Sequence, residues 1–131
     1  MIGVRAKVRD EKHKVVRKAK EAHFESLSHA GGAIRKTAIR SIRKGTKPAP
    51  PGQPPHTQTR RLPRAIKYAV EKKRQVVVVG PDVESFGTAG RAHEFGGRFR
   101  GDYYDRRPFM RPALEKLKGR LPWFWANSIR R

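Results

Sequence analysis

The sequence contains no cysteine among its 131 residues. This absence excludes disulfide scaffolds, thiolate zinc sites and cysteine nucleophiles. Acidic residues are also scarce, with 11 Asp and Glu against 32 Lys and Arg, so the formal net charge is +21 at pH 7. Such a positive excess is typical of proteins that bind nucleic acid or assemble with other macromolecules.

Apolar residues are few as well, because hydrophobic types make up 36% of the chain and aromatic types 8%. The longest aliphatic run, Val76 to Val79, is far too short to span a bilayer, and the basic first twenty residues do not resemble a signal-peptide core. We therefore expect a soluble protein made in the cytoplasm. The length predicts one domain, and the small core predicts that a partner or self-assembly supplies part of its stability.

Residues 1–44 are predicted to form a basic helical segment. Apolar or small side chains recur there at steps of three or four, which places them on one face of a helix. Gly31 and Gly32 interrupt this pattern, so the segment forms either one long helix with a weak point or two helices with a bend. The face consists of Val16, Ala19, His23, Leu27, Ala30, Ile34, Ala38 and Ile42.

Residues 45–60 are predicted to form a loop or arm. The stretch from Gly45 to Thr59 contains five prolines and two glycines, a composition that disfavours both helices and inner strands. A segment of this kind can fold onto a neighbouring subunit during assembly.

Residues 61–131 are predicted to form the α+β core. Alternating residues from Ile66 to Val70 and the valine run Val76–Val79 indicate an antiparallel hairpin that ends at Gly80-Pro81. A short helix over Thr88–Glu94, an irregular third strand near Phe99 to Tyr104 and a C-terminal helix over residues 108–131 follow. The expected fold is thus a long N-terminal helix, a small antiparallel sheet built on the hairpin, a short helix and a C-terminal helix packed on the sheet.

The sequence offers little support for catalysis or metal binding. Its histidines are scattered, and His93-Glu94 lacks the second histidine of a zincin helix. No serine has a nucleophile-elbow setting, and the glycine-rich stretch near Gly90 matches no phosphate-binding or dinucleotide motif. We predict a protein that is not an enzyme and has no cofactor and no metal. A pocket that gathers Asp82, His93 and Glu94 around a metal would favour the alternative of a small enzyme.

Basic residues cluster at several places where they could contact a partner or phosphate groups. The same residues could also form no more than a solvated charged surface. The candidates are Arg35, Lys36, Arg40, Arg43, Lys44, Arg60, Arg61, Arg64, Arg107 and Arg111.

Several short motifs follow one another in a characteristic order: Pro51-Gly52-Gln53-Pro54-Pro55, then Arg61 to Ile66, Val79-Gly80-Pro81, Ala92 to Gly97, and Arg107 to Leu114. Their order and spacing resemble the head-tail joining proteins of tailed bacteriophages, also called tail-completion or putative minor tail components of the lambdoid-phage type. The resemblance runs from about Ala30 to Ser128. The residues that it marks as structural are Gly80, Pro81, His93, Glu94, Phe95, Gly96, Gly97, Pro108, Phe109 and Pro112.

The resemblance implies a structural virion protein of the phage neck that joins the tail tube to the head connector as a subunit of a ring. Its partners would be copies of itself, the neighbouring tail-tube or terminator and head-connector proteins, with possible non-specific DNA contact and no membrane. In this interpretation Phe95 packs in the core, Gly96 and Gly97 let the chain reverse, and Phe109, Leu114 and Leu117 dock the last helix on the sheet. The net charge of +21 supports an alternative, a basic nucleic-acid-binding module of ribosomal-like or nucleoid-like type.

Overall fold

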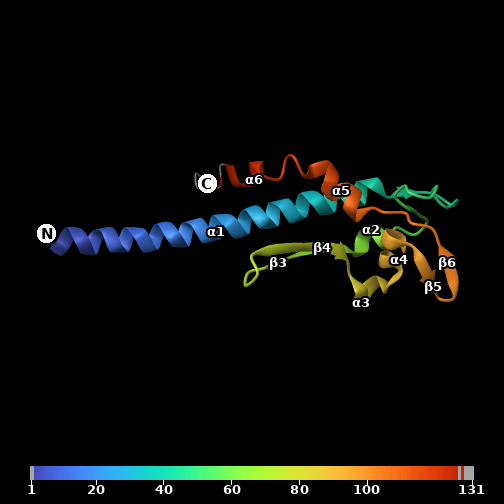
Figure 1. The fold of residues 1–131 in the computed structure, drawn as a ribbon, viewed down its shortest axis with the longest axis horizontal. Coiled ribbons are helices and arrows are strands. Elements are labelled where there is room, and N and C mark those ends of the chain that lie inside the picture. Colours follow the sequence, from blue (N-terminus) through green and yellow to red (C-terminus); the bar gives the residue numbers. More distant parts are fainter. Residues whose placement is uncertain (1, 127, 129–131) are drawn as a thin grey trace.

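A long helix organises the other elements of the chain. The computed structural model describes residues 2–126 and 128, and helix α1 (Ile2–Ser41) extends along much of the molecule, with strands β5 (Gly97–Phe99) and β6 (Asp102–Tyr104) beyond its C-terminal end (Figure 1). The body packs around the C-terminal half of α1, whereas the N-terminal part of α1 projects beyond it (Figure 1). The predicted α+β class is confirmed.

The two glycines do not divide α1, which is one continuous helix rather than two. A Cβ atom on Gly31 would lie only 2.6 Å from Val77 Cγ2 and 2.9 Å from Tyr68 Cδ2. Gly31 therefore lets the hairpin approach the helix backbone closely. The helix ends at Ser41, before the predicted Lys44, because the chain turns into strand β1 (Arg43–Lys44).

The proline-rich segment lies against its own chain. Strand β2 (His56–Thr57) pairs in parallel with β1, which brings the two ends of the segment together. Farther along, the Gly52 amide donates to the Arg106 carbonyl at 2.7 Å and Arg107 Nε donates to the Ala49 carbonyl at 2.6 Å. These bonds hold the segment in place within one subunit.

The predicted hairpin is present as strands β3 (Ile66–Glu71) and β4 (Val76–Pro81), which pair in antiparallel register from Ile66 opposite Pro81 to Glu71 opposite Val76. Helix α2 (Arg61–Ala65) leads directly into β3. One side of the hairpin packs on α1. Gly80 and Pro81 belong to β4, so the strand continues past the predicted stop after Val79.

The region after the hairpin contains more elements than the sequence predicts. Helix α3 (Val83–Phe86) was not expected, whereas α4 (Ala89–Phe95) matches the predicted short helix. Strands β5 (Gly97–Phe99) and β6 (Asp102–Tyr104) form a separate antiparallel pair instead of adding a third strand to β3 and β4.

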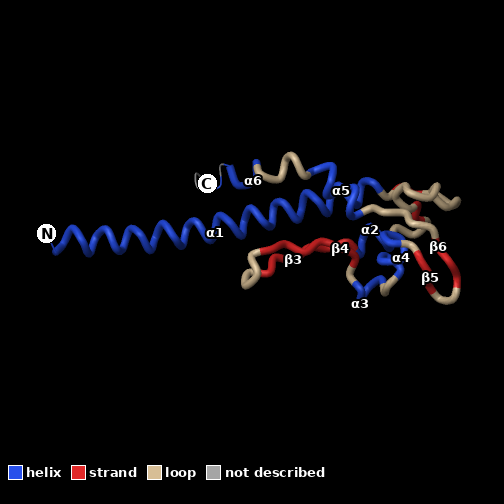
Figure 2. The backbone as a smooth tube through the Cα atoms, viewed as in Figure 1, coloured by secondary structure: helices blue, strands red, loops and turns tan. Residues whose placement is uncertain are grey.

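The C-terminal region forms two helices instead of the single helix predicted over 108–131. Helix α5 (Met110–Leu117) is followed by turns and by α6 (Trp123–Ala126), and residues 127 and 129–131 lie outside the described part of the chain. Both helices pack chiefly on α1, on the side of α1 away from the hairpin (Figures 1 and 2). The predicted docking of the last helix on the sheet is thus replaced by docking on α1. Trp125 Nε1 donates to His23 Nδ1 at 3.0 Å across this contact.

A small cluster of side chains joins α1, α2, β3 and α5. Its small size agrees with the scarcity of apolar types in the sequence. Its buried members are Ala38, Ile42, Leu62, Ile66, Phe109 and Ala113.

The two adjacent glycines of α1 provide a matched test of this packing. We expect Gly32→Ala to raise the free energy of unfolding by about 0.5–1 kcal/mol, because alanine favours the helix and its Cβ would meet nothing closer than 3.9 Å. Gly31→Ala should instead lower it by about 1 kcal/mol, because the clash with Val77 and Tyr68 outweighs the same helix gain. Urea unfolding of both variants measures the difference, and equal stabilisation by the two would contradict the close approach.

Candidate assembly site

The carboxylate of Glu94 joins two of the motifs found in the sequence. Glu94 lies near the end of α4 and is only 9% exposed. Its Oε2 accepts hydrogen bonds from the Phe109 amide at 2.8 Å and the Met110 amide at 2.9 Å, and its Oε1 accepts one from the Arg111 amide at 2.9 Å. These amides begin helix α5, so Glu94 satisfies donors that the helix cannot pair internally and places negative charge at its positive end.

The prediction that Phe95, the residue after Glu94, packs in the core is wrong. Phe95 was expected in the core, but its side chain is 70% exposed, and Phe109 is the fully buried aromatic residue instead. Adjacent residues on a short helix point in different directions, so α4 can aim Glu94 at α5 only by turning Phe95 outward. Among the docking residues predicted on α5, Leu114 is also exposed.

Two glycines follow helix α4, and the second of them begins strand β5. Gly96 and Gly97 have φ angles of 69° and 105°, values that favour glycine. A second close approach occurs where a Cβ on Gly90 would lie 2.6 Å from Pro81 Cγ, so that α4 packs tightly against the end of β4. Pro81 of the predicted motif therefore has a packing role, and the Arg107 amide donates to the His93 carbonyl at 2.7 Å.

An open apolar groove of about 1020 Å³ lies between β4, the α3–α4 region and α5. Five consecutive β4 residues, Val77 to Pro81, line it, and in the described chain β4 pairs with β3 alone. An unpaired strand border beside apolar side chains is a surface onto which another chain can add. The large side chains that the groove leaves exposed are Val78, Val83, Phe95 and Leu114.

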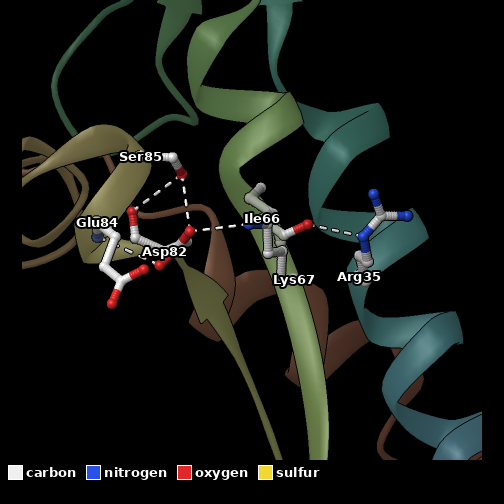
Figure 3. A network of polar contacts seen from close by, with 6 residues as sticks. All are labelled: Arg35, Ile66, Lys67, Asp82, Glu84 and Ser85. Atoms are coloured by element: carbon white, nitrogen blue, oxygen red, sulfur yellow. Dashed lines mark hydrogen bonds and ion pairs between the residues drawn. The ribbon is translucent and has the colours of Figure 1, made fainter.

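A polar network fixes α3 beside the hairpin (Figure 3). Asp82 accepts hydrogen bonds from Lys67 Nζ at 2.8 Å and Ser85 Oγ at 3.0 Å with Oδ2, and from the Glu84 amide at 3.2 Å with Oδ1. The Lys67 contact and the other two donors keep the pKa of Asp82 below its ordinary value of 3.8. On the other side of β3, Arg35 Nε of α1 donates to the Ile66 carbonyl at 2.7 Å (Figure 3).

The arrangement does not gather the three residues of the alternative enzyme hypothesis. Glu94 binds three amides of α5, and Asp82 binds Lys67 and α3. Burial, with the nearby Arg107 guanidinium, lowers the pKa of His93 below its ordinary value of 6.5. Over the described residues no group of three or more His, Asp or Glu is placed to hold a metal ion.

The basic residues predicted to contact a partner lie at different places in the structure. Arg35 and Arg107 use their Nε atoms to bind backbone carbonyls within the chain. Arg111 lies beside the apolar groove, and Arg40 and Arg43 line a second, polar groove. The remaining candidates are exposed at other places: Lys36, Lys44, Arg60, Arg61 and Arg64.

Two further observations bear on the class of protein. No described helix is both long and apolar enough to cross a membrane. Comparisons with protein-family models, curated proteins and solved structures find no match to this chain. The class must therefore be inferred from the residues and their arrangement.

Replacing Glu94 by glutamine tests the connection between α4 and α5. We expect Glu94→Gln to lower the free energy of unfolding by about 2 kcal/mol, because an amide cannot accept three hydrogen bonds from α5 as a carboxylate does. Urea unfolding measures the change, with exposed Glu21→Gln on α1 as the control. Equal effects of the two substitutions would show that the capping contacts contribute little.

The pKa of Asp82 predicts how stability depends on pH. A carboxylate with a depressed folded pKa stabilises the fold above its unfolded pKa of about 3.8, and this contribution is lost as the pH falls through the folded value. Asp82→Asn should therefore be less stable than the wild type at neutral pH, and the two should converge in strong acid. Thermal unfolding across this pH range checks the trend, and a constant difference down to the lowest pH would contradict it.

Proposed function

We propose that this chain is a structural virion protein of a phage neck, which joins the tail tube to the head connector as a subunit of a ring. The supporting observation is the apolar groove beside the free border of β4, since it exposes Val78, Phe95 and Leu114 to solvent. The motif resemblance supplies the class. Glu94 joins two of the motifs on which it rests, Ala92 to Gly97 and Arg107 to Leu114, through its hydrogen bonds to the amides of α5. In this proposal the protein is made in the host cytoplasm and functions in the virion.

The occupant of the groove is a second copy of the chain. Ring closure needs two different surfaces that fit each other, because a head-to-tail contact repeats around an axis. The second surface is the projecting part of α1, where Val15 is 66% exposed and Val16 is 47% exposed. Val16 continues the stripe that the body covers from His23 onward, so this stretch has an apolar face that its own subunit leaves bare.

The chain acts through binding and not through catalysis in this proposal, with no cofactor and no metal. Its two most constrained carboxylates, Asp82 and Glu94, connect helices and strands. The ring would contact tail-tube or terminator proteins on one side and head-connector proteins on the other. Since each subunit carries a formal charge of +21, copies repel one another, and added salt should promote their association.

Light scattering coupled to size exclusion tests self-association, with Phe95→Ser as the groove variant. We expect the wild type to form oligomers more readily as salt increases, and Phe95→Ser to weaken association about 30-fold, the cost of losing a central aromatic contact. Tyr103→Ser is the matched control, because Tyr103 is 75% exposed and does not line the groove.

Reconstitution with purified tail tubes tests the neck assignment itself. The proposal expects the protein to join tube ends and the Phe95→Ser variant to do so poorly. A wild type that stays monomeric at every salt concentration and never binds tubes would overturn the proposal and favour the alternative, a basic nucleic-acid-binding module.

A further inference from the structure

A second groove, of about 710 Å³, lies between the C-terminal end of α1 and helix α5. Arg40 and Arg43 border it on the α1 side, and Lys116 of α5 and the following Arg120 border it on the other. The proline-rich segment contributes Gln53 and Pro54. Close packing of α1 on α5 through Ala38, Ile42 and Ala113 fixes the distance between the two walls.

The charged side chains of this groove all have the same sign. No Asp or Glu lines it, and its four Arg and Lys side chains are exposed. In the described part of the chain, the carboxylates that form ion pairs are Glu25, Glu71 and Asp82, and none pairs with these cations. Four like charges held around one groove create a positive potential that an anionic ligand would relieve.

The polar groups of the groove favour phosphate contact through the cations. Thr37 and Ser41 also line it, but their hydroxyls donate to the carbonyls of Ala33 and Ala38 within α1. The guanidinium and ammonium groups therefore provide the strongest donors that face the groove.

We propose that this groove binds the sugar-phosphate backbone of double-stranded DNA without sequence preference. Single-stranded nucleic acid usually needs several aromatic side chains on which its bases stack. No Phe, Tyr or Trp lines this groove, and the aromatic ring that does is His56, whose Nδ1 contacts the Lys47 carbonyl at 3.0 Å. Contacts from Arg and Lys to successive phosphates need no base to be exposed. This inference goes beyond the neck assignment and does not depend on ring formation, since each subunit carries a complete groove.

Fluorescence anisotropy with a short labelled DNA duplex tests the proposal on the full chain. The groove variant carries Arg40→Glu and Lys116→Glu, and the control carries Lys73→Glu and Arg98→Glu, which changes the net charge equally at exposed positions outside the groove. We expect the groove variant to bind about tenfold more weakly or worse, and the control to change affinity less than about twofold to threefold. The slope of log affinity against log salt should fall by about 2 in the groove variant, since each phosphate contact contributes about 0.9.

Three results would contradict the proposed DNA-binding groove. Equal losses in the two variants would show that affinity follows total charge and would overturn the proposed site. Tighter binding of a single strand of the same length would also overturn it. So would the absence of DNA binding together with binding of polyglutamate that the groove variant loses and the control variant keeps, a result that would favour an acidic protein partner. Because all four substituted side chains are exposed, both variants should keep the wild-type circular dichroism and melting temperature. Light scattering at the same salt concentration measures ring formation separately, so that a loss of DNA binding is distinguished from a failure to form rings.

Discussion

The capping of α5 by Glu94 determines how the C-terminal half of the chain is arranged. A helix start buried against another element needs partners for its first amides, and α5 has no side-chain cap of its own at Phe109. Glu94 supplies these partners from α4, and it brings Phe109 into the core between α1 and β3. The same geometry exposes Phe95 beside β4, so one buried carboxylate both completes the core and creates the apolar groove.

Charge is the second constraint on this protein. With a net charge of +21 on 131 residues, positive side chains repel one another both within a folded subunit and between the subunits of a ring, and nearby anions reduce this repulsion. The few carboxylates contribute to structure, as Asp82 and Glu94 do, and leave most cations unpaired among the described residues. Added salt weakens the repulsion between copies, which favours self-association through the apolar groove, and it also weakens the binding of DNA to the polar groove. Ionic strength therefore distinguishes the two binding activities.

Much of the fold could be predicted from the sequence because its signals are local. The helical stripe of α1, the alternation from Ile66 and the glycines after Glu94 each specify their own element. Packing partners were harder to predict. The helical pattern near Leu114 shows an apolar face but not whether that face meets the sheet or α1, and in the structure α5 packs chiefly on α1.

The candidate sites depended still more on tertiary contacts. His93, Glu94 and Phe95 were predicted to be structural, yet which of Glu94 and Phe95 is buried depends on where the amides of α5 lie. Lys116 and Arg120 were not predicted as partner contacts, because they join Arg40 and Arg43 only when α5 packs on α1. Their spacing gives no usable signal, because α5 ends at Leu117 and Arg120 lies in the turn that follows, so the i, i+4 geometry of a helix does not place them on one face.

The projecting part of α1 has a geometric consequence for any larger structure. Residues 2–21 extend beyond most of the body as continuous helix, a rod of about 30 Å at 1.5 Å per residue. A rigid helix of this length fixes the distance between the surfaces that contact its two ends. Inserting one residue would lengthen it by about 1.5 Å and rotate its tip by about 100°. Natural variation in the length of this segment should therefore occur in steps close to whole helical turns.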